Sequence, residues 1–147
     1  MMLCRMSLFA AVAVVAAGCG KGEYETASVS GRVTLNGQPV AKVAVMFQPI
    51  APEGNLNPGP GSYGVTDSDG RYTLKLIGKE TSGAVVGKHK VRIEVYTDPG
   101  DSSDDRPRKW VKPAVQIPTK YNQDKAILEF EVPASGTDEA NFDLKSP

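Results

Sequence analysis

The stretch VSGRVTLNGQPVAKVAVMFQP, residues 29–49, decides the fold, because apolar and polar residues alternate on both sides of a turn. Before the turn, small or apolar side chains share one face and polar side chains share the other, as a half-buried β-strand requires. The first set is Val29, Gly31, Val33 and Leu35, and the second set is Ser30, Arg32 and Thr34. Asn36 and Gly37 both tolerate positive φ, so they predict a tight turn after this strand. A second strand follows over residues 43–47.

The same alternation recurs through the rest of the chain. It predicts further strands around residues 71–76, 90–95, 128–132 and 142–144. No window of helical length carries apolar residues at the spacing i, i+3, i+4 and i+7, so we expect little helix. About six or seven short strands separated by Gly- and Pro-rich turns predict an all-β chain, folded as an antiparallel β-sandwich. The predicted core consists of Val33, Leu35, Val45, Phe47, Leu74, Val91, Ile93, Val95, Phe130 and Phe142.

Residues 1–18 have the composition of a secretory signal peptide. Arg5 precedes an apolar run from about Leu8 to Ala17, and small residues follow it. This run is too short for a membrane-spanning helix, which needs about 20 apolar residues. We therefore expect residues 1–18 to be removed and the rest of the chain to be exported.

The signal peptide ends in Ala16-Ala17-Gly18-Cys19, which resembles the bacterial lipobox. In that motif a dedicated peptidase cuts before a cysteine that has been modified with diacylglycerol. Ala16 stands where the motif usually has Leu, so ordinary signal-peptide cleavage nearby is the alternative. We expect Cys19 to carry acyl chains such as palmitate, residues 19–27 to form a tether, and residues 28–147 to form one domain. The expected location is the bacterial cell envelope, at the outer membrane, facing the periplasm or the exterior.

The charge and the cysteine content argue against nucleic acid as a partner and against disulfide bonds in the domain. The 17 basic residues balance 17 acidic residues, without a basic stripe interleaved with aromatic residues, so nucleic acid is not an expected partner. Cys4 leaves with the signal peptide and Cys19 would carry lipid, so the domain has no thiol to form a disulfide. Its stability must therefore come from packing.

The segment VTDSDGRYTL at residues 65–74 has two interpretations. Asp67 and Asp69 can accept hydrogen bonds from local amides while Gly70 supplies positive φ, as a turn requires. The alternative is a calcium loop, which would need further oxygen ligands and a glutamate at its twelfth position. The chain continues instead into RYTLKL. We therefore predict a turn and no metal site.

Catalytic residues are scarce. His89 is the only histidine, and it lies in a predicted strand without a nucleophile elbow such as G-x-S-x-G anywhere in the chain. Zinc ligands at tetrahedral spacing are absent from the sequence as well. We therefore interpret His89 as a partly buried or edge residue of the fold, and we expect neither an enzyme nor a cofactor.

The charged loop DPGDSSDDRPRKWVKP, residues 98–113, offers the best ligand contact. Trp110 is the only tryptophan, and Arg106 and Arg108 are near it. A tryptophan beside guanidinium groups can hold a sugar, a peptide or an anionic headgroup by stacking and cation–π contact. The alternative is that Trp110 packs over the end of the sandwich while the charges keep the loop solvated. Tyr121 is interpreted as a packing residue at a strand corner.

Several segments together resemble the transthyretin-like, carboxypeptidase-regulatory-like domain. They are VSGRVTLNGQPVAKVAVMFQP, GVTDSDGRYTL, VVGKHKVRIEVY, IPTKYNQDKAILEFEV and NFDL. The likeness is greatest to small lipoproteins of this type in planctomycete bacteria. It implies a seven-stranded prealbumin-like (Ig-like) β-sandwich, in a family whose members mostly lack an assigned activity. The hydroxyisourate hydrolases of this fold use more than one histidine and a C-terminal Tyr-Arg-Gly-Ser motif, whereas this chain ends NFDLKSP.

The expected function is therefore non-catalytic. We expect a structural or interaction module that a lipid anchor holds at a membrane of the envelope, with an envelope protein or polysaccharide as its partner. The alternative is a carbohydrate- or peptide-binding lipoprotein that uses the loop around Trp110.

Overall fold

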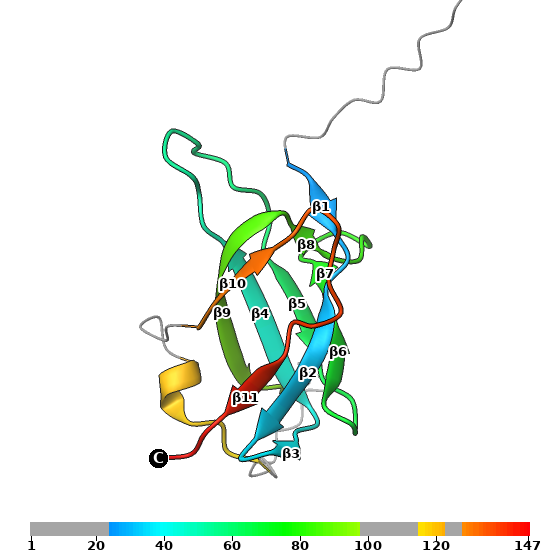
Figure 1. Ribbon diagram of the computed structural model, residues 1–147, viewed down its shortest axis with the longest axis vertical. Helices are drawn as coiled ribbons and strands as arrows, with labels where there is room; N and C mark the ends of the chain where they lie inside the picture. Colours follow the sequence, from blue (N-terminus) through cyan, green and yellow to red (C-terminus); the bar gives the residue numbers. More distant parts are fainter. Residues whose placement is uncertain (1–23, 98–114, 123–127) are drawn as a thin grey trace, which may run out of the picture.

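The computed structural model describes residues 24–97, 115–122 and 128–147 (Figure 1). Within these ranges the chain is all-β, with short strands and a single 3₁₀ turn, η1 (Thr119–Tyr121). The described residues contain no helix that is long and apolar enough to cross a membrane.

The larger sheet has five strands, and all of its neighbours are antiparallel. In spatial order they are β10 (Leu128–Val132), β9 (Gly87–Val95), β4 (Val43–Pro49), β5 (Ser62–Val65) and β7 (Lys75–Leu76). The longest strands, β4 and β9, form its centre and pair from Val43↔Val95 to Pro49↔His89. Because this register aligns their inward residues, the two strands supply much of the core.

The smaller sheet is built around β2 (Ser30–Leu35). Its other members are β11 (Phe142–Leu144), β3 (Gln38–Pro39) and β6 (Arg71–Thr73). The turn between β2 and β3 has Asn36 at φ 51° and Gly37 at φ 83°, which confirms the predicted turn. The predicted strand over residues 43–47 does not pair across this turn, because it lies in β4 of the larger sheet.

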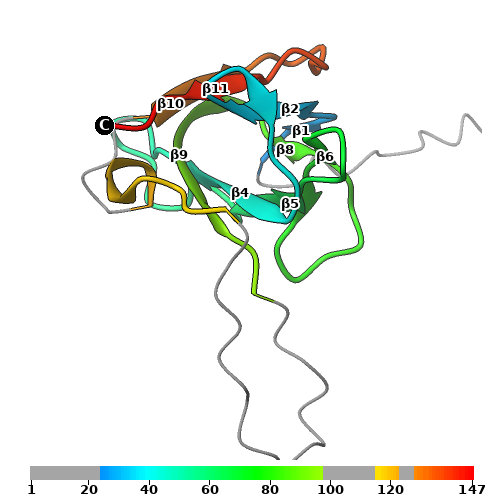
Figure 2. The same ribbon diagram turned by 90° about the horizontal axis from the view of Figure 1, so that it is seen from below.

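The two sheets face each other around the core, with β2 and β11 opposite β4 and β5 (Figure 2). Residues 71–76 join them on one side, because β6 pairs with β2 while β7 pairs with β5. The antiparallel prediction is wrong at one place, since β11 runs parallel to β2. The chain leaves β10 at the end where β2 begins and returns along the edge of β2, so it runs in the same direction as β2 (Figure 1).

The predicted tether is too long. Thr26–Ala27 form β1, which pairs with β8 (Ala84–Val85), and Ala27 is buried. The backbone N–H of Val86 also donates to the carbonyl of Glu25 over 2.8 Å. The folded part therefore begins before residue 28, because these main-chain groups find strand partners.

Most of the predicted core is buried. The confirmed members are Val33, Val45, Phe47, Leu74, Val91, Ile93 and Phe142. Leu35, Val95 and Phe130 are only partly buried, although they pack against the core. Phe130 lies on β10, an edge strand of the larger sheet, so fewer neighbours cover it. Its ring still meets the ring of Phe47 with centroids 5.7 Å apart, edge to face.

Candidate binding groove

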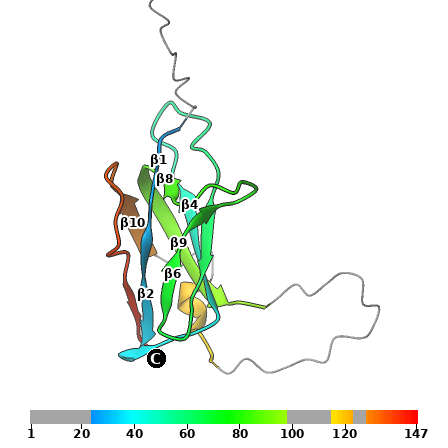
Figure 3. The same cartoon turned by 90° about the vertical axis from the view of Figure 1, so that its right-hand side faces the viewer.

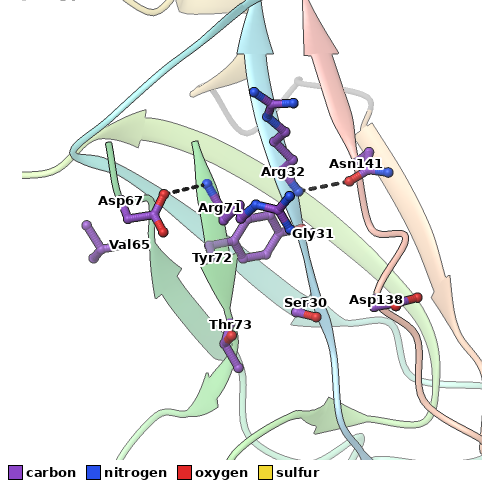
Figure 4. A pocket seen from close by; sticks show the side chains of 10 residues that line it. All are labelled: Ser30, Gly31, Arg32, Val65, Asp67, Arg71, Tyr72, Thr73, Asp138 and Asn141. Carbon is purple, nitrogen blue, oxygen red and sulfur yellow. Dashed lines mark hydrogen bonds between the residues drawn. The ribbon is translucent and has the colours of Figure 1, made fainter. Parts of the chain in front are cut away.

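A polar groove of about 600 Å³ lies on the outer flank of β2 and β6 (Figure 4). The segment before β11 forms its other wall (Figure 4). Alternation explains the polarity, because the outward positions of both strands carry hydrophilic side chains. The lining residues are Ser30, Gly31, Arg32, Val65, Asp67, Arg71, Tyr72, Thr73, Asp138 and Asn141.

Two arginines oppose each other in this groove. The register of β2 and β6 places Arg32 directly across from Arg71, and both are exposed. Like charges at directly opposite positions destabilise a sheet, so this pair has an electrostatic cost that a bound anion would offset. The Nε of Arg32 donates to the carbonyl of Asp69 over 2.9 Å, which orients the guanidinium group of this exposed residue. Asp138, also exposed, adds a carboxylate to the opposite wall.

The wall before β11 is held close to β2 by a glycine and a tyrosine. A Cβ on Gly31 would lie 1.9 Å from the carbonyl oxygen of Ala140, so only glycine allows this approach. Tyr72, the partner of Gly31 across the strand pair, donates its hydroxyl to the same oxygen over 2.6 Å. Burial raises the pKa of the Tyr72 phenol above its ordinary value, so the hydroxyl stays protonated as a donor. Asn141 completes the wall by accepting from the backbone N–H of Arg32 over 2.9 Å.

Asp67 and Asp69 form a turn, as predicted. The Oδ1 of Asp67 accepts from the backbone N–H groups of Asp69 and Arg71, each over 2.9 Å. Gly70 has φ 72°, and its N–H donates to the carbonyl of Asp67. The Asp67 carboxylate is therefore committed to the backbone of its own turn, which is a common use of aspartate at such positions. Among the described residues, no group of three or more His, Cys, Asp or Glu side chains could hold a metal ion.

His89 belongs to the core. The prediction of a partly buried or edge position is wrong, because the side chain is fully buried. Its ring lies 5.5 Å from the ring of Phe47, centroid to centroid. Its Nδ1 bonds the carbonyl of Gly87 over 3.0 Å, whereas the buried Nε2 has no hydrogen-bond partner within the described ranges. Desolvation lowers the pKa of His89, and the bond to Gly87 opposes this effect in part. The histidine is therefore neutral at pH 7.

The site residues predicted from sequence fall outside the described residues. These are Cys19, Arg106, Arg108 and Trp110. Lipidation of Cys19 and ligand contact by Trp110 therefore stay predictions. Tyr121 is described: it lies in η1, packs against the core, and accepts a hydrogen bond from the N–H of Lys145 over 3.0 Å. Its packing role is confirmed.

The sequence did not single out Arg32, Arg71, Asp138 and Asn141. Alternation places both arginines on outward faces, but it does not show that their strands are neighbours. That information comes only from the pairing of β2 with β6.

Comparison of the chain with protein-family models, with curated proteins and with solved structures finds no match.

Proposed function

We propose that this chain is a non-catalytic, lipid-anchored interaction module of the bacterial envelope, built on a prealbumin-like sandwich. The strand order supports the fold proposal. Residues 71–76 pair with β2 and then with β5, and β8 is separated from β9 by one residue. Counting each of these two pairs as one strand, and setting aside the two-residue strands β1 and β3, leaves seven strands, in the orders β10-β9-β4-β5 and β11-β2-β6. This arrangement of two facing sheets resembles that of transthyretin-like domains.

The main support for an interaction role is the polar groove. Arg32 and Arg71 present their guanidinium groups from strands whose backbones are fixed by pairing, and Asn141 is fixed to β2 by a hydrogen bond. Guanidinium forks bind carboxylate and phosphate groups through paired hydrogen bonds. We therefore infer that the partner, an envelope protein or polysaccharide, carries such anionic groups.

A capture experiment tests this role. The tagged mature protein is incubated with envelope extract, and the bound material is compared between wild type and the double variant Arg32→Gln/Arg71→Gln. Lys88→Gln/Lys90→Gln is the matched control, because it removes two exposed charges from β9 on the other sheet. We expect the control to retain the partner and the groove variant to lose it. Equal capture by both variants, or no partner for wild type, would contradict the proposal.

A further inference from the structure

The end of the domain where the chain enters, here called the chain-entry end, comprises Tyr24, β1, β8, the loop of residues 50–61 and Ile77 at the base of this loop. Tyr24 is held against the domain, because its ring lies beside Gly59, where an added Cβ would be 3.0 Å from it. The Lys79 ammonium lies 5.0 Å from the centroid of the same ring. Tyr24 is therefore in contact with the folded domain, and only residues 20–23 separate it from Cys19 in the sequence.

The chain-entry end also carries the most exposed apolar side chains. Leu56 is 100% exposed and Ile77 is 48% exposed, the two highest values among the large hydrophobic residues that the structure describes. Leu56 belongs to the loop of residues 50–61, which projects at the same end as the start of β1 (Figures 1 and 3). Ile77 lies at the base of this loop, since its N–H donates to the carbonyl of Gly61 over 2.9 Å. Tyr24 and Lys79 add an aromatic ring and an ammonium group, which are typical of membrane interfaces.

The short connection limits how far this end can stand from a membrane. Five Cα steps lead from Cys19 to Tyr24, and at about 3.6 Å per step they span at most roughly 18 Å. This is shorter than the extended length of the tether expected from sequence, because β1 takes up its last residues. A lipid on Cys19 would therefore hold the chain-entry end, and not the Asn36–Gly37 turn at the opposite end, next to the lipid headgroups (Figure 1).

We propose that in the lipidated protein the chain-entry end docks on the phospholipid surface, with Leu56 inserted at the boundary between headgroups and acyl chains. This inference rests on the lipid anchor proposed above. A single exposed leucine is ordinary on a protein surface, but here the tether brings it to an apolar phase. In this orientation the groove of Arg32 and Arg71 opens sideways, on the flank of β2 and β6, and stays accessible to a partner.

Site-directed fluorescence tests the docking. The full chain carrying Leu56→Cys is produced in a bacterium that processes lipoproteins, purified from its membranes, labelled with the environment-sensitive dye NBD and reconstituted into phosphatidylcholine–phosphatidylglycerol vesicles. The label is specific, because Cys4 leaves with the signal peptide and an acylated Cys19 has no free thiol. Gln38→Cys is the matched control, since Gln38 is exposed on β3 at the opposite end.

We expect the dye at position 56 to shift to shorter wavelength and to be quenched by spin-labelled lipids, several-fold more than the dye at position 38. Equal spectra and equal quenching at the two positions, in protein whose mass shows an acylated Cys19, would overturn the docking and leave the lipid anchor intact. An unmodified Cys19 would overturn both. Circular dichroism of the two labelled proteins shows whether the fold is preserved, which the full exposure of Leu56 leads us to expect.

Discussion

Replacing Gly31 by alanine tests the contact that builds one wall of the groove. The added Cβ would lie 1.9 Å from the carbonyl oxygen of Ala140 and 2.4 Å from its carbonyl carbon. Both are backbone atoms, so the segment before β11 must move away by about 1.5 Å to reach an ordinary contact of about 3.4 Å. This movement would break the 2.6 Å hydrogen bond from Tyr72.

The magnitude follows from two contributions. Overpacking of a tight contact costs about 1–3 kcal/mol. The lost hydrogen bond adds about 1 kcal/mol. Gly31→Ala should therefore lower the free energy of unfolding by roughly 2–4 kcal/mol. Equilibrium urea unfolding of the non-acylated mature chain, followed by far-UV circular dichroism, measures this change.

A double-mutant cycle with Tyr72→Phe separates the two contributions. Tyr72→Phe alone should cost about 1–2 kcal/mol, because it leaves the Ala140 carbonyl without this donor. In the Gly31→Ala background it should cost far less, since the bond is already broken, giving a coupling of about 1 kcal/mol. Ser30→Ala, at an outward position next to Gly31, should change stability by less than about 0.5 kcal/mol. A loss below about 1 kcal/mol for Gly31→Ala, or strict additivity in the cycle, would refute this reasoning.

Three further predictions concern the turn, the core and the buried histidine. Asp67→Ala should lower the free energy of unfolding, measured by thermal unfolding, by about 1–2 kcal/mol, since two backbone N–H groups lose their acceptor. Asp69→Ala should change it by less than about 0.5 kcal/mol, and calcium should leave the wild-type Tm unchanged. A rise in Tm on adding calcium would instead support the metal interpretation. Phe47→Ala should lower the free energy of unfolding in urea by about 3–5 kcal/mol, clearly more than Phe130→Ala does, because Phe47 is only 1% exposed. A larger loss for Phe130→Ala would contradict the position of β10 at the edge of the sheet. Burial lowers the pKa of His89 in the folded protein, so below about pH 6.5 the unfolded chain binds more protons than the folded chain. The free energy of unfolding should therefore decrease as the pH is lowered below this value, by up to about 1.4 kcal/mol per pH unit. His89→Gln should remove most of that fall between pH 6.5 and 5.5, and an unchanged profile would show that other groups cause it.

Alternation along the chain was enough to predict β2, β4, β9, β10 and β11 and most of the core. It missed β5, because the buried residues of that strand are Ser62 and Gly64 rather than apolar ones. Each inward residue of β4 and β9 follows from a period of two, and a slip of one residue would have exposed them all. The turn at Asn36 and Gly37 was predictable because its φ values depend on local residue type.

Long-range relations were not predictable in this way. Period-two patterning is the same for parallel and antiparallel neighbours, so the direction of β11 beside β2 was missed. The groove depends on which strands pair, and nothing local indicates that Arg32 faces Arg71 or that Tyr72 reaches Ala140. The polar residues before β1 resembled a tether because two-residue strands carry almost no pattern.

The most direct test of the lipid-anchored module is the intact mass of the mature protein, purified from the membrane fraction of a bacterium that processes lipoproteins. We expect a chain that begins at Cys19 and carries a diacylglyceryl group, and a Cys19→Ser variant that is missing from the membranes. A chain that begins elsewhere, an unmodified Cys19, or wild-type protein recovered entirely in the soluble fraction would contradict it.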